Sequence, residues 1–143
     1  MPTRTAEANW NGSLMEGKGT ITLGSKAFSG PYDWKGRSGD GPGTNPEELI
    51  AAAHAGCFSM ALSHQLAQGG HPPRRVHTTA RVQFEKQAEG FAITRIELRT
   101  EAQVPGIDNA AFQKAAQGAK DGCPVSKALK ATPITLEAKL LPG

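Results

Sequence analysis

The sequence has few cysteines, few aromatic residues and no long apolar run. Only 2 of its 143 residues are cysteine, and aromatic residues make up 6%. No stretch reaches the roughly eighteen consecutive apolar residues of a membrane-spanning helix, so we expect no membrane contact. The segment Met1–Trp10 is polar and lacks the apolar core of a secretory signal. These absences predict a cytoplasmic protein.

Clustered positive charge is absent as well. The formal net charge is +3, but the basic residues are spread singly along the chain and only Arg74 and Arg75 are adjacent. Nucleic-acid-binding proteins usually concentrate their lysines and arginines on one face or in one run. We therefore expect no nucleic-acid partner.

The two cysteines, Cys57 and Cys123, do not form a recognised short motif. A structural disulfide is rare in a reducing compartment, and two inert buried thiols are the simplest interpretation. His54 could join both cysteines around zinc, but no paired C-x2-C or H-x3-H spacing supports such a site. We expect neither a metal nor an organic cofactor.

Alternation of apolar and polar residues predicts strands, with helical patterns between some of them. Residues 76–85 and 91–104 form an expected hairpin, and the Gly- and Pro-rich residues 29–44 an expected long loop of functional importance. Further strands are predicted at 5–10, 19–23 and 134–140, and helices at 110–120 and directly after Cys123. Neither repeats nor a linker are visible, so a single domain over residues 1–143 is expected.

A long central helix is the clearest local prediction. Asn45 can cap its start, Pro46 suits the first helical position, and Glu48 has capping-box spacing. The helix should continue to Gly69-Gly70, with apolar or very small residues nearly all round it. A helix of this kind is buried in a core or in an interface.

Three reactive side chains share one side of that helix. At about 100° per residue, Glu47, His54 and Cys57 fall within a sector of roughly 80°. A carboxylate, an imidazole and a thiol therefore point in similar directions. His54 is equally well explained as a histidine of the core, and Glu47 as a residue that complements the helix dipole.

Cys123 is expected at the N-cap of the helix that Pro124 opens. Free N–H groups and the helix dipole at that position stabilise a thiolate, and Lys120 and Lys127 add positive charge. Local sequence thus predicts Cys123 as the more acidic thiol. Arg37, eight residues before Asn45, is the candidate cation for a sulfur anion, although a solvated loop arginine is the simpler interpretation.

Several segments together resemble the OsmC/Ohr family of osmotically inducible and organic hydroperoxide resistance proteins. They occur in the order the family has them, and the likeness extends from about Glu7 to the C-terminus. His54 and the position of Arg37 favour the OsmC branch. The matching segments are Thr44–Ser63, Gly90–Thr94, Val104–Ile107 and Gly122–Ser126.

The resemblance implies an α+β fold in an intertwined homodimer, with antiparallel sheets wrapped around a long buried central helix. Two active sites would lie near the subunit interface. Cys57 would attack the peroxide and Cys123 would resolve the product as an intramolecular disulfide. Arg37 and Glu47 correspond to the arginine and glutamate of the family's site.

The implied activity is that of a cysteine-based hydroperoxide reductase in oxidative and osmotic stress defence. The substrate would be an organic hydroperoxide, preferred over hydrogen peroxide because apolar residues such as Ile50 and Phe58 surround Cys57. A dithiol, lipoyl-type or thioredoxin-like, would be the reductant. Two alternatives use the same residues differently: a peroxide sensor that switches a partner, and a non-catalytic module that binds a hydrophobic ligand.

Overall fold

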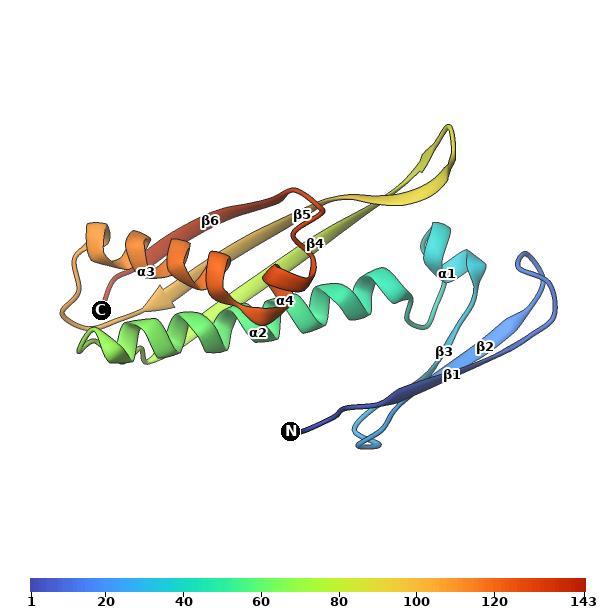
Figure 1. Ribbon diagram of the computed structural model, residues 1–143, viewed down its shortest axis with the longest axis horizontal. Coiled ribbons are helices and arrows are strands. Elements are labelled where there is room, and N and C mark those ends of the chain that lie inside the picture. The colour runs from blue at the N-terminus through green and yellow to red at the C-terminus, as the bar shows by residue number, and fades with distance from the viewer. The chain divides into compact units, whose positions relative to one another are not determined.

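The computed structural model describes residues 1–143 as two compact units, Met1–Leu49 and Ile50–Gly143. The prediction of a single domain stays a prediction. Figure 1 labels the elements in chain order. They are β1 (Ala6–Asn11), β2 (Lys18–Leu23), β3 (Ser29–Tyr32), α1 (Trp34–Ser38), α2 (Pro46–Gln68), β4 (Arg75–Gln87), β5 (Gly90–Gln103), α3 (Asn109–Gly122), α4 (Pro124–Ala128) and β6 (Ile134–Leu141).

The first unit contains an antiparallel sheet in the order β1-β2-β3. The chain leaves β1 through Gly12, whose φ of +100° is accessible mainly to glycine. Gly19 on β2 pairs with Trp10 on one side and Tyr32 on the other, and the two aromatic rings lie 5.2 Å apart. A side chain at Gly19 would collide with both rings. Glycine is therefore required there for the aromatic pair to form across β2.

The expected long loop over residues 29–44 is partly wrong, because it contains β3 and the short helix α1. Pro31 obscured the strand, but β3 is at the edge of its sheet, where proline is tolerated. Asp33 caps α1 by accepting a 2.8 Å hydrogen bond from the N–H of Gly36. Arg37 is consequently held on a capped helix rather than on an irregular loop.

The second unit contains the sheet β4-β5-β6 with β5 in the centre. Strands β4 and β5 form the predicted antiparallel hairpin. Strand β6 runs parallel to β5, so the expectation of purely antiparallel sheets is wrong for this pair. The physical reason is the connection: the chain returns from β5 to β6 through α3 and α4, and such a crossover brings strands together in parallel.

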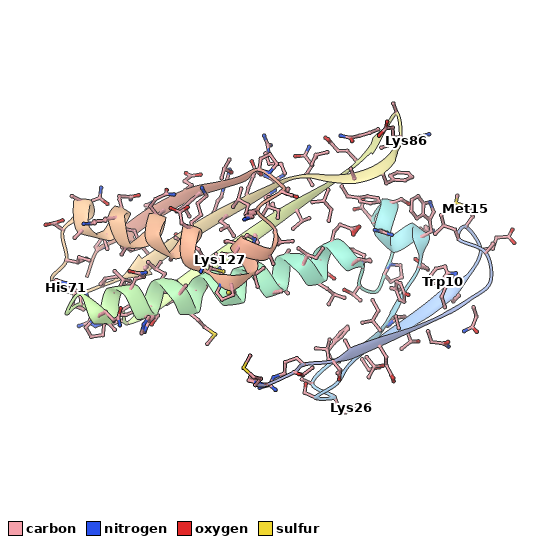
Figure 2. All side chains as sticks on the ribbon, in the orientation of Figure 1. Trp10, Met15, Lys26, His71, Lys86 and Lys127 are labelled. Atoms are coloured by element: carbon pink, nitrogen blue, oxygen red, sulfur yellow. The ribbon has the colours of Figure 1, made fainter.

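Helices α2 and α3 lie on one face of this sheet, and their side chains fill the space against it (Figures 1 and 2). The α2 contribution is a stripe at four-residue spacing, Phe58, Leu62 and Leu66, as expected on one face of a helix. The α3 and sheet contributions are Phe112, Ala116, Ala119, Leu98, Ala102 and Val104. The α+β class and the long helix are thus confirmed.

Helix α2 begins as predicted but is buried on one side only. The Asn45 side chain accepts a 2.8 Å hydrogen bond from the N–H of Glu48. The Glu48 carboxylate accepts from the Thr44 hydroxyl, also at 2.8 Å. Beyond the buried stripe the helix carries exposed small residues and Met60, whose exposure reaches 77%. No helix of the protein is both long and apolar enough to cross a membrane.

Candidate active site

The two cysteines meet although they are far apart in sequence. Cys57 lies near the middle of α2, one residue before the buried Phe58, and Cys123 lies between α3 and α4. Their sulfurs are 2.7 Å apart and both cysteines are free. Cys123 is fully buried, whereas Cys57 keeps some solvent exposure. A disulfide, with sulfurs about 2.05 Å apart, would need only a small movement.

Backbone hydrogen bonds hold Cys123 at the ends of both helices. Its N–H donates to the carbonyl of Ala119 at 2.9 Å and so completes α3. Its carbonyl accepts from the N–H of Lys127 at 3.0 Å and so begins α4, with Pro124 at the first position. The N-cap position predicted for Cys123 is confirmed.

The surroundings of the two thiols shift their pKa values in opposite directions. Burial raises the pKa of the Cys57 thiol, and the hydrogen bond it shares with Cys123 raises it further, against a smaller effect of the Val125 N–H. Burial also acts to raise the pKa of Cys123, but hydrogen bonds from Cys57, from the N–H and hydroxyl of Ser126 and from the N–H of Val125 lower it overall.

These directions agree with the prediction from the helix cap that Cys123 is the more acidic thiol. Either thiol can donate to the other across the 2.7 Å contact. The uncharged Cys123 thiol makes no side-chain cap hydrogen bond. Its anion is stabilised most by the hydrogen bond from Cys57 and then by the N–H and hydroxyl of Ser126 and the N–H of Val125, so the first proton lost by the pair leaves its negative charge mainly on Cys123.

His54 lies one helical turn before Cys57 and contacts the same site. Its side chain is fully buried, and its Nε2 is 2.6 Å from the hydroxyl oxygen of Ser126, the third residue of α4. Burial lowers the pKa of His54, which keeps the imidazole neutral. His54 is thus a residue of the core, as one interpretation of the sequence had it. Its Nε2 also contacts α4, the short helix that Cys123 caps.

Arg37 and Glu47 form a second pair within residues 1–49. The Nε and Nη2 atoms of Arg37 donate to the two carboxylate oxygens of Glu47 at 2.8 and 3.1 Å. Glu47 is buried, and the Arg37 side chain remains 35% exposed. A bidentate pair fixes the plane of a guanidinium, which leaves its remaining N–H groups directed elsewhere.

The candidate residues thus fall into two groups, Cys57 with Cys123 and Arg37 with Glu47. Ser126 was part of the sequence pattern but received no role, although its place three residues after a helix-capping cysteine was a usable signal. Lys120 lies in the last turn of α3 and Lys127, which Figure 2 labels, lies on α4. Together with Ser126 they line the same surface hollow.

Comparison with known proteins places these features in a family context. The family profile described as OsmC-like protein matches residues 39–139. The chain is 49% identical over 138 residues to the Escherichia coli protein named peroxiredoxin OsmC, with 96% of each chain covered. It is 38% identical over 104 residues to the organic hydroperoxide resistance protein of Xanthomonas axonopodis pv. citri, covering 72% of this chain and 70% of that one.

A solved structure agrees with the fold. The organic hydroperoxide resistance protein OsmC of Legionella pneumophila superposes with a TM-score of 0.70 at 24% identity, covering 94% of this chain and 96% of that one.

Proposed function

We propose that this protein, which belongs to the OsmC-like family, is a thiol peroxidase that reduces organic hydroperoxides to alcohols in defence against oxidative and osmotic stress. The observation that carries the proposal is the pair of free sulfurs 2.7 Å apart, one partly exposed and one buried. Such a pair suits an exposed sulfur that meets the oxidant and a neighbour that captures the oxidised product. The names of the E. coli and Xanthomonas relatives support the same activity.

In the first step the Cys57 thiolate attacks the terminal oxygen of the hydroperoxide. A sulfur–oxygen bond forms, the oxygen–oxygen bond breaks, and the departing alkoxide takes up a proton to leave as an alcohol. Cys57 becomes a sulfenic acid. Access supports this assignment, because Cys57 has solvent-exposed surface and Cys123 has none.

In the second step the Cys123 sulfur attacks the sulfenic sulfur of Cys57. The sulfur–sulfur bond forms as the sulfur–oxygen bond breaks, and the departing hydroxide takes the proton that Cys123 gave up, forming water. A dithiol, lipoyl-type or thioredoxin-like, then returns two electrons and restores both thiols. The cytoplasm, where such dithiols are kept reduced, is the location we propose.

The lower pKa of Cys123 does not contradict the attack by Cys57. Loss of one proton from a hydrogen-bonded thiol pair leaves a single proton between two sulfurs 2.7 Å apart, and its transfer to Cys123 places the charge on Cys57. A nearby cation would favour that transfer. We propose Arg37, oriented by Glu47, as this cation and as a donor to the peroxide oxygens.

Peptide mapping tests the proposed chemistry. Fully reduced protein is treated with one equivalent of cumene hydroperoxide without a reductant, and the products are digested and identified by mass. We expect a disulfide between Cys57 and Cys123 in the wild-type chain. In the Cys123→Ser variant, a sulfenic acid trapped on Cys57 is expected instead. Two unmodified thiols after treatment would contradict the peroxidase proposal and favour a ligand-binding module.

A homodimer is the assembly we propose. The proposal is supported by the exposed residues of α2, small ones and Met60 at 77% exposure, on a helix whose opposite side packs in the core. Light scattering on the purified protein should give about twice the mass of one 15.0 kDa chain. The Met60→Lys variant should shift the mass toward that of one chain, because a charge buried in an apolar contact is unfavourable. A monomeric wild-type protein would contradict the proposal.

A further inference from the structure

A buried histidine beside the cysteine pair has no part in the steps above. His54 is fully buried, one turn before Cys57 and one turn before the core residue Phe58. Its Nε2 bonds Ser126 Oγ at 2.6 Å, while its Nδ1 is buried with no hydrogen-bond partner. A leucine or phenylalanine would fill this core position without leaving a polar atom unpaired. Leaving Nδ1 buried and unpaired costs folding free energy, which suggests that the hydrogen bond of Nε2 serves a function.

We propose that His54 is a positioning residue for Cys123, acting through Ser126: the neutral imidazole donates its Nε2–H to the Ser126 hydroxyl oxygen, and the Ser126 hydroxyl then donates to the Cys123 sulfur. The role in resolution rests on the function proposed above. The hydrogen-bond chain itself is argued from the His54–Ser126 contact and from the place of Ser126 in the helical turn that Cys123 caps, both within residues 50–143.

The hydrogen-bonding of His54 favours the tautomer with its proton on Nε2. With the proton on Nδ1, a buried N–H donor would have no acceptor at all. Orphaned buried donors are rarer in proteins than acceptors with unused capacity, because their loss of solvation is not compensated. With the proton on Nε2, the 2.6 Å contact to Ser126 becomes a donated hydrogen bond and only a lone pair on Nδ1 stays unused.

This tautomer decides where the Ser126 proton points. A serine hydroxyl has one proton to donate and can accept from other groups. Because Nε2–H already donates to Ser126, the hydroxyl proton cannot be used on His54 and is available to Cys123. Ser126 is the third residue of α4 and Cys123 is its N-cap, the spacing at which capping residues meet. The Ser126 hydroxyl is among the groups that lower the pKa of Cys123.

The expected consequence is that Cys123, the resolving cysteine, is present as a thiolate at a lower pH than an ordinary cysteine would be. Attack on the sulfenic acid of Cys57 requires the thiolate of Cys123 rather than its thiol. A neutral imidazole suits this role, because burial keeps His54 uncharged and it serves as a fixed donor. The other titratable groups around the cluster are Cys57 on α2, Lys120 and Asp121 on α3, Lys127 on α4 and Lys130 just after α4.

Thiolate absorbance against pH tests the proposal in a Cys57→Ser background, where Cys123 is the single thiol. His54→Gln keeps an N–H donor but cannot be protonated, whereas His54→Phe removes the donor and fills the space. Ser126→Ala removes the middle of the chain. Lys120 and Lys127 are unchanged in every variant, so differences report on His54 and Ser126 alone.

We expect His54→Phe and Ser126→Ala each to raise the pKa of Cys123 by about one unit, about tenfold less thiolate at a fixed pH below it. The double variant should shift no further than either single one, since both break the same chain. His54→Gln should retain most of the original pKa.

Two results would overturn the proposal. An unchanged titration in both His54→Phe and Ser126→Ala would reduce His54 to a packing residue. A shift in His54→Gln as large as that in His54→Phe would mean that a titrating imidazole, rather than a fixed donor, is needed. If His54→Phe fails to fold, Ser126→Ala takes its place in both comparisons: no shift in Ser126→Ala, or an equal shift in His54→Gln and Ser126→Ala, would overturn the proposal. The titration needs no peroxide, so its failure is distinct from failure of the peroxidase proposal in the peptide map.

Discussion

Replacing Cys57 with serine is expected to lower the rate of dithiol-dependent reduction of cumene hydroperoxide by about a thousandfold or more. Loss of a catalytic nucleophile typically costs on the order of 10³ to 10⁶ in turnover. The fully buried Cys123 cannot replace it, because its sulfur has no exposed surface for a peroxide to reach. The measurement is the alcohol produced per chain per unit time with the dithiol in excess.

The Cys123→Ser variant separates attack from resolution. It should release close to one equivalent of alcohol per chain and then stop, since the first oxidation consumes only the Cys57 thiol and no second cysteine is left to resolve the sulfenic acid. Ser63→Ala, on the same helix and without a side-chain role in the proposed chemistry, is the control and should turn over at the wild-type rate. Wild-type turnover by Cys57→Ser would contradict the assignment of roles, and loss of the first equivalent in Cys123→Ser would show that Cys123 is the attacking sulfur.

Replacing Arg37 with glutamine is expected to slow the oxidation of Cys57 by about a hundredfold. Removing one donor that stabilises charge in a transition state costs about 10²- to 10³-fold, and Arg37 is proposed to stabilise both the thiolate and the peroxide oxygens. Arg37→Lys should recover part of the rate, because it keeps the charge but loses the bidentate contact with Glu47. The measurement is single-turnover oxidation followed by loss of free thiol.

Neighbouring residues supply the controls for Arg37. Lys35 lies on the same short helix, is exposed, and carries the same charge, so Lys35→Gln should leave the oxidation rate unchanged. Glu47→Gln should slow oxidation less than Arg37→Gln, since it loosens the guanidinium without removing it. Equal rates for Arg37→Gln and Lys35→Gln would contradict a role for Arg37 in the chemistry.

Local sequence signals predicted the elements whose ends are set by short-range chemistry. Helix α2 begins where Asn45 and Pro46 place it, and α3, Asn109–Gly122, contains the predicted helix over residues 110–120. The β4–β5 hairpin follows from alternation alone. Strand β3 was missed because Pro31 disguises an edge strand, and the parallel pairing of β6 depends on a crossover that no local pattern records.

The candidate site was less accessible to local reasoning. Nothing in the spacing of Cys57 and Cys123 predicts their contact, and only the resemblance to a family brought them together before the fold did so at 2.7 Å. The lowered pKa of Cys123 agrees with its place at a helix start, but its largest favourable contribution is the hydrogen bond from Cys57, which the sequence alone does not indicate. Ser126 was missed because a serine in the first turn of a short helix is common; its spacing from Cys123 was a weak signal, and the approach of His54 from α2 gives it weight.

The backbone hydrogen bonds of Cys123 limit how much the surface of the protein can change when the cysteines are oxidised. The residue ends α3 with its N–H and starts α4 with its carbonyl, so its backbone is tied on both sides. With the sulfurs 2.7 Å apart, we expect bond formation to Cys57 to turn the two side chains and leave both helices intact. A sensor needs oxidation to reshape a surface that a partner can distinguish. A disulfide that forms and is reduced without a change in the backbone offers a partner little to recognise. Such a pair is better suited to repeated catalytic turnover.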